Sequence, residues 1–122
     1  MSMTKFKAMS FAFFLATPCL VDADEAAEQM VQDALPVMYH TCASVIEEAD
    51  GDETYVLAVV EKMTALSIYN RQIDIGDHAT SDEDKAALRE TFLTALSEGC
   101  SDDKDALLGG VVDNAVKTTL GL

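Results

Sequence analysis

The stretch LTALSEGCSDDKDALLGG, residues 93–110, places a cysteine between two helical patterns. Gly99 is expected to end the first helix in a left-handed conformation, because glycine is the usual residue there. Ser101 or Asp102 is expected to cap the next helix, since short polar side chains accept hydrogen bonds from its first free N–H groups. Cys100 would then lie at a helix junction, as a nucleophile, a metal ligand or half of a disulfide.

Helical patterns also fill the rest of the chain after residue 24. Apolar residues recur at steps of three and four over 25–48, 52–71, 80–99 and 102–120, which predicts four amphipathic helical regions. The residues expected to face inward in the last three regions are Val56, Val59, Val60, Met63 and Leu66, then Leu88, Phe92, Ala95 and Leu96, then Leu108, Val111, Val112, Ala115 and Thr119. Strand signals are weak. The predicted fold is all-α, a compact bundle of four to five short helices with one disulfide, forming a single domain over residues 24–122.

The boundaries of these helices have recognisable signals. Pro36 interrupts the first region, which is either kinked there or divided into two helices with Pro36 in the first turn of the second. Gly51 is expected to stop that region, and Asp52 to cap the next. TSDE (80–83) has the pattern of a capping box with its threonine as the cap. The glycine pair at 109–110 predicts either a close helix crossing or a break.

Residues 1–23 have the layout of a secretory signal peptide. Lys5 and Lys7 precede an apolar run over 8–21, and Val21 and Ala23 occupy the −3 and −1 positions of a cleavage site. The run is about 14 residues long, too short to cross about 30 Å of hydrocarbon as a helix. We therefore expect a cleavable signal peptide, export to the periplasm and no membrane association after cleavage.

The chain is strongly acidic, with 22 Asp and Glu against 8 Lys and Arg and a net charge of −14. Without residues 1–23, 21 acids face 6 Lys and Arg, a balance of −15. Such a surface repels nucleic acid and anionic membranes, so neither is an expected partner. It suits a basic protein partner, although the acidity can also serve solubility alone.

Two cysteines remain in the expected exported chain, Cys42 and Cys100. Exported domains with two cysteines usually cross-link them, so a Cys42–Cys100 disulfide is predicted. The bridge would close a 59-residue loop and stabilise the fold by roughly 4 kcal/mol in the chain-entropy model. A redox motif is disfavoured because there is no Cys-x-x-Cys. A catalytic thiol is disfavoured because His40, two residues from Cys42, would point away from it on a helix.

Other candidate sites have weaker patterns. Asp74, Asp77 and His78 could together bind a cation weakly, but a solvated loop is the favoured interpretation. The acids at 47–53 lack the spacing of an EF-hand loop. Arg71 is interpreted as stabilising the last carbonyls of its helix. No phosphate loop, zinc spacing or nucleophile motif is present, so we expect no metal, no cofactor and no enzymatic activity.

The order of segments resembles a known family. YHTCASVIEE (39–48), a valine-rich second helix, a capped third helix and LSEGCSDDKDALLGGVVDNAVKTTL (96–120) together resemble the HdeA/HdeB group. Those proteins are small helical periplasmic acid-stress chaperones in which one disulfide joins an early helix to a late one. The resemblance carries over residue by residue only to Cys42 and Cys100.

The function expected from these observations is protein binding. The first hypothesis is an exported small helical binding protein, an HdeA-like acid-stress chaperone that protects periplasmic proteins. The alternative is an acidic inhibitor or immunity protein that neutralises a basic exported effector. The expected partners are accordingly protein clients or a basic protein, with a second copy of the chain as a further candidate.

Overall fold

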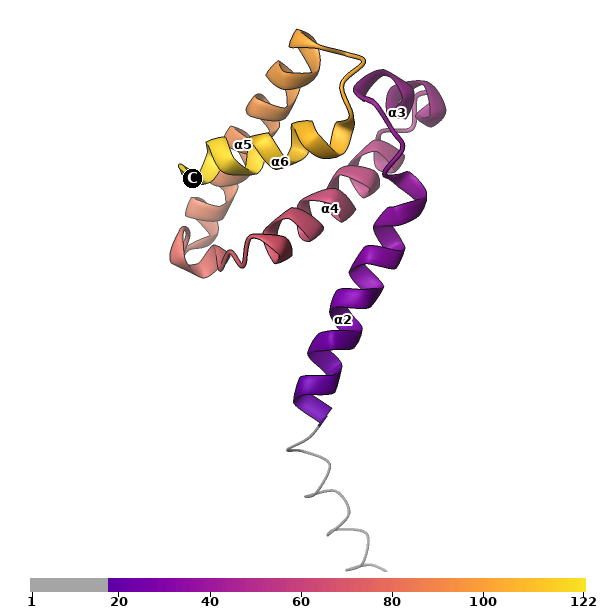
Figure 1. Cartoon of the computed structure of the whole chain (residues 1–122). Coiled ribbons are helices and arrows are strands. Elements are labelled where there is room, and N and C mark those ends of the chain that lie inside the picture. Colours follow the sequence, from indigo (N-terminus) through magenta and orange to yellow (C-terminus); the bar gives the residue numbers. More distant parts are fainter. Residues whose placement is uncertain (1–17) are drawn as a thin grey trace, which may run out of the picture.

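The computed structural model describes residues 18–122, with side chains from residue 25 onward. Its α-helices are α2 (Pro18–Ala34), α3 (Cys42–Ala49), α4 (Glu53–Asn70), α5 (Asp82–Asp102) and α6 (Leu108–Leu120). Two 3-10 turns, η1 (Leu35–Val37) and η2 (Ile75–Asp77), lie in the connections. The described part of the chain contains no strand, only an isolated bridge between Thr41 and Leu107. The predicted all-α class is confirmed (Figure 1).

The core lies where α3, α4 and α6 meet. Its buried members are Cys42, Val45, Val59, Val60, Met63, Leu108 and Val112. In α4 and α6 these follow the predicted inner faces, because steps of three and four bring them to one side of a helix. In α5 the predicted inward residues are only half-buried, and the helix has no fully buried side chain. Part of the inner face of α5 therefore borders open space.

α2 lies mostly outside this core. Its C-terminal end packs against α4, with Ala34 fully buried, while Figure 1 shows its N-terminal end standing away from the other helices. The helix begins at Pro18 and so runs through the predicted cleavage position after Ala23. The rest of the predicted signal peptide, residues 1–17, lies outside the described residues.

The first helical region is divided into two helices. α2 ends at Ala34, and Pro36 lies in η1 rather than in the first turn of the second helix. α3 instead begins after Thr41, whose hydroxyl accepts from the Ser44 N–H at 2.9 Å, while the Ser44 hydroxyl accepts from the Thr41 N–H. This reciprocal pair satisfies two backbone donors, so it fixes where α3 begins.

The next two helix starts agree with the sequence signals to within a residue. Asp50 and Gly51 have positive φ angles of 49° and 91° and end α3, as expected for Gly51. Asp52 caps α4 as predicted, accepting from the Thr54 N–H. For α5 the predicted cap was wrong: Ser81, not Thr80, accepts from the Asp84 N–H at 3.0 Å. The two adjacent hydroxyls are chemically equivalent caps, so only the backbone register chooses between them.

The junction around Cys100 differs most from the prediction. α5 does not end at Gly99 but continues to Asp102, and α6 begins at Leu108 rather than after Ser101 or Asp102. Gly99 is required for packing instead, because a Cβ there would lie 2.8 Å from Val111 Cγ1. Its small size therefore allows α5 and α6 to approach closely.

The acidic loop between α5 and α6 supports the start of α3. Backbone carbonyls of Lys104 and Ala106 accept from the N–H groups of Ala43 and Cys42, at 2.9 and 3.1 Å. These donors have no partner within their own helix, so the loop satisfies them. α6 runs unbroken through the glycine pair, and Gly109 lies under the Met38 side chain. No helix in the described part is both long and apolar enough to cross a membrane.

Candidate functional site

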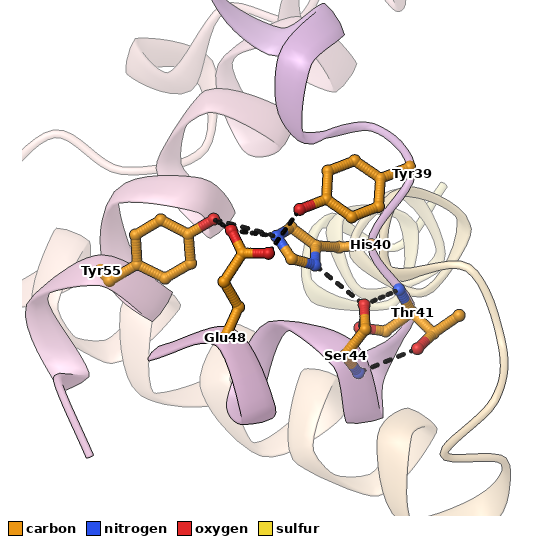
Figure 2. Close-up of polar contacts among 6 residues, drawn as sticks. All are labelled: Tyr39, His40, Thr41, Ser44, Glu48 and Tyr55. Carbon is orange, nitrogen blue, oxygen red and sulfur yellow. Dashed lines mark hydrogen bonds and ion pairs between the residues drawn. The ribbon is translucent and has the colours of Figure 1, made fainter. Parts of the chain in front are cut away.

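A buried histidine occupies the connection between α2 and α3. His40 is 0% exposed, and both of its ring nitrogens have partners (Figure 2). Nδ1 lies 2.8 Å from the Ser44 hydroxyl and Nε2 lies 2.9 Å from the Tyr55 hydroxyl. The Glu48 carboxylate approaches Nε2 to 3.7 Å. A polar ring is thus held away from solvent with no unpaired nitrogen.

Two tyrosines converge on the carboxylate of this cluster. The Tyr39 hydroxyl donates to Glu48 Oε1 at 2.6 Å, and the Tyr55 hydroxyl donates to Glu48 Oε2 at 2.7 Å. The Tyr39 ring also lies 4.2 Å from the His40 ring, centre to centre. Glu48 itself remains 51% exposed at its side chain. We call these five residues, Tyr39, His40, Ser44, Glu48 and Tyr55, the histidine cluster.

Local sequence positions the cluster on three segments. Ser44 and Glu48 are four residues apart on α3, so they share one face of that helix. Tyr55 comes from the first turn of α4. The His40 carbonyl accepts from the Leu108 N–H at 2.9 Å, which connects the same residue to the start of α6. The cluster therefore holds the α2–α3 connection against α4 and α6.

The hydrogen bonds shift the titration of the cluster. The hydroxyls of Tyr39 and then Tyr55 stabilise the charged carboxylate and hold the pKa of Glu48 below its usual 4.5. The same bond to Glu48 raises the pKa of Tyr55 to about 12 and also raises that of Tyr39. The stabilisation that Glu48 contributes is therefore present above its unfolded pKa and is lost as pH falls through its lowered folded value.

The geometry also indicates where the imidazole carries its proton. The single hydroxyl proton of Tyr55 is directed to Glu48, so its oxygen accepts from Nε2–H. In the neutral ring Nδ1 then accepts from Ser44. If Nδ1 is protonated, it donates to the Ser44 oxygen, and the Ser44 hydroxyl can turn to the Thr41 carbonyl at 3.4 Å. Both charge states of the ring can thus be hydrogen-bonded in one arrangement.

Ser44, His40 and Glu48 are residue types found in hydrolase triads, but their arrangement favours a structural role. The Ser44 hydroxyl already takes part in the capping box of α3. The ring is fully buried, so a substrate has no access to it. Nucleophilic catalysis requires an accessible hydroxyl beside a base. The exposed Glu48 carboxylate is the titratable group of the His40–Glu48 pair that solvent reaches directly.

The two cysteines singled out by the sequence are joined. Cys42, the first residue of α3, forms a disulfide with Cys100 in the last turn of α5, with the Cα atoms 5.6 Å apart. Cys42 is buried in the core and Cys100 packs against it. The bridge therefore fixes α5 to the N-terminal end of α3.

The other candidate residues have local roles. Asp74 caps η2 by accepting from the Gly76 N–H, while Asp77 and His78 are exposed beside it. Across the described residues, no group of three His, Cys, Asp or Glu side chains is placed to hold a metal ion. Arg71 does not stabilise helix carbonyls as expected; it forms a two-fold hydrogen-bonded ion pair with Asp113 of α6, at 2.9 and 2.7 Å.

The sequence prediction does not include the histidine cluster, because it treats His40 only as a possible base for the Cys42 thiol. The helical spacing of Ser44 and Glu48 could have indicated that the two share a face. Nothing local indicated Tyr55, which is fifteen residues from His40 and reaches it only through the turn between α3 and α4.

Comparisons with protein-family models, curated proteins and solved structures found no match, so the HdeA/HdeB resemblance stays a prediction from sequence.

Proposed function

We propose that this protein is an exported helical binding protein that acts as an acid-stress chaperone in the periplasm. The observation that carries the proposal is the histidine cluster, a joint built from a buried imidazole and a carboxylate that receives two tyrosine hydroxyls. Imidazoles and carboxylates are the groups that acid protonates first. The joint lies between α2 and the rest of the fold, where loosening it changes the exposed surface.

Acid would act on this joint through Glu48. Protonation removes the negative charge that accepts from Tyr39 and Tyr55 and that lies 3.7 Å from His40 Nε2. Apart from adjoining η1, α2 makes its main helix contact with α4. Release of the α2–α3 connection would free α2, including its buried Ala34, and uncover the surface of α4 against which α2 packs. That surface could then hold an unfolding client.

The overall charge supports action at low pH. Residues 24–122 would change from −15 to about +8 once the 21 carboxylates and both histidines are protonated. A net charge far from zero keeps a protein soluble while its apolar surface is exposed. The disulfide would keep the core helices together during this change.

The test measures light scattering of an acid-labile client shifted to about pH 3, with and without the oxidised protein. We expect suppression of aggregation at acid pH and none at neutral pH. Glu48→Gln, which removes the charged acceptor permanently, should suppress aggregation at a higher pH than the wild type. Glu47→Gln removes a neighbouring exposed charge outside the cluster and should behave as the wild type.

Two results would count against this function. If the wild type does not suppress aggregation at any acid pH, the chaperone proposal fails. If the two glutamine variants shift the onset equally, then general charge rather than the histidine cluster controls the response.

A second candidate is an acidic inhibitor of a basic exported effector. Its support is that, among the described residues, only Asp113 and Glu48 lie within ion-pair distance of a Lys, Arg or His side chain, so most of the carboxylates are left for a partner. Pull-down from a periplasmic extract should then recover one stoichiometric basic protein, with affinity that falls steeply in salt. A partner insensitive to salt would contradict this alternative.

A further inference from the structure

A groove of about 380 Å³ lies between α4, the first half of α5 and the C-terminal end of α6. Its apolar lining consists of Leu57, Val60, Ala65, Ile68, Ile75, Leu88, Phe92, Leu93, Val116 and Leu120. Small-molecule sites are typically clefts of about 300–1,000 Å³, mainly apolar, with a few placed polar groups. The size and lining of this groove are those of such a site.

Two cations border the apolar surface. Lys85 and Arg89 both line the groove and are four residues apart on α5, so they lie one turn apart on the same face. Like charges at this spacing repel each other. Neither forms an ion pair with a carboxylate in the part of the chain that the structure describes. Both are exposed, so in a chain with 22 acids and 8 Lys and Arg these two cations are available to an anion from outside the chain.

The charge of the lining is opposite to that of the molecule. Glu61 on α4 is the one acidic residue among the lining residues, so the lining contains two cations and one carboxylate. The chain as a whole carries −14. Most of the acidic surface repels an anion, whereas the positively charged lining of the groove attracts one.

The exposed rim and the size of the groove indicate the kind of occupant. Leu57 and Leu93 line it yet remain 40% and 36% exposed, so a hydrocarbon chain lying there would remove apolar surface from water. The volume of about 380 Å³ is in the range of small-ligand sites. A slender ligand with an apolar body and one anionic end fits both observations.

We propose that this groove binds a free single-chain aliphatic carboxylate, a molecule of the fatty-acid class. The hydrocarbon chain lies along the apolar lining between α4 and α6, and the carboxylate lies beside Lys85 and Arg89. The inference is independent of the chaperone proposal, because the histidine cluster contributes no residue to the groove.

Isothermal titration calorimetry with dodecanoate below its micelle concentration tests the proposal at neutral pH. We expect one molecule bound per chain, with perturbed NMR signals of Leu57, Leu93 and Val116. Dodecyltrimethylammonium has the same chain and the opposite charge, and should bind at least about tenfold more weakly, since each tenfold change needs only one charge-assisted contact. Equal affinity for the two amphiphiles would overturn the assignment of the anionic end.

Matched double variants separate the groove from general charge. Lys85→Gln/Arg89→Gln should weaken dodecanoate binding at least about tenfold. Lys62→Gln/Lys104→Gln removes the same charge from exposed positions outside the groove and should change affinity less than about twofold. Equal weakening by both pairs, or absence of dodecanoate binding by the wild type, would overturn the proposal. Binding to phosphatidylglycerol vesicles in place of dodecanoate would overturn it too.

Discussion

His40 shows how a single side chain can serve as a joint. A buried polar group without a partner costs about 1–3 kcal/mol, so the ring nitrogens can be buried only because Ser44 and Tyr55 pair them. The backbone carbonyl of the same residue accepts from Leu108. Side chain and backbone together therefore connect the chain before α3 to α4 and α6.

The proton position on His40 can be predicted at this scale. At neutral pH we expect Nε2 to carry the proton, because the Tyr55 hydroxyl donates to Glu48 and is left to accept from the ring. Long-range ¹H–¹⁵N spectra of the ring would distinguish the two nitrogens. His78, which is exposed, serves as the internal reference with no fixed partner. A proton found on Nδ1 would mean that the Tyr55 hydroxyl points to the ring instead.

At the scale of elements, different interactions hold α6 against α5 and against α4. α5 and α6 approach closely where Gly99 meets Val111. α4 and α6 are joined by Arg71, Ser67 and Asp113, and the Arg71 guanidinium first, then the Ser67 hydroxyl, lowers the pKa of Asp113 to about 2. The contribution of that carboxylate is present above its unfolded pKa and is lost only as pH falls toward 2. The α4–α6 link is thus suited to persist in acid.

Two glycine substitutions test the helix contact. Gly99→Ala should lower the free energy of unfolding by up to about 2 kcal/mol, because overpacking against Val111 outweighs the gain in helix propensity. Gly110→Ala, where no atom lies within 4 Å of the added methyl, should raise it by about 0.5–1 kcal/mol. Urea denaturation measures both. Stabilisation by both substitutions would show that α5 and α6 are less closely packed than described.

At the scale of the whole molecule, the disulfide closes the fold. It connects the start of α3 to the end of α5. Backbone carbonyls of the loop between α5 and α6 accept hydrogen bonds from the first N–H groups of α3. A covalent bond and backbone hydrogen bonds thus hold the same junction. α2 lies outside this closed unit, which is consistent with its proposed release in acid.

Removal of the bridge should reduce stability strongly. Cys42→Ala/Cys100→Ala is expected to lower the free energy of unfolding by about 4 kcal/mol, because a separation of 58 residues leaves much chain entropy to be restricted. Urea denaturation with and without reductant provides the measurement. Reductant should lower the free energy of unfolding of the wild type toward that of the variant, and should leave the value for the variant unchanged. If the disulfide of the wild type is fully reduced and the free energy of unfolding does not change, the bridge does not stabilise the fold as proposed.

The sequence by itself determined the all-α class, the end of α3, both ends of α4, the start of α5 and the cysteine pair. These follow from local rules: apolar steps of three and four, caps such as Asp52, and the tendency of exported domains to oxidise two thiols. Gly99 is the instructive failure. Its sequence context indicates a helix end, but its observed role depends on Val111, twelve residues away on another helix.

Only the tertiary structure decided which distant side chains meet. The partner of Arg71 is forty-two residues away, and Tyr55 and Glu48 reach His40 from two different helices. The apolar groove likewise exists because α4, α5 and α6 leave space between them, and only four of its lining residues, Val60, Leu88, Phe92 and Thr119, are among those that the sequence predicts to face inward. Helical periodicity specifies which side of a helix is apolar, whereas the crossing of the helices determines what that side touches.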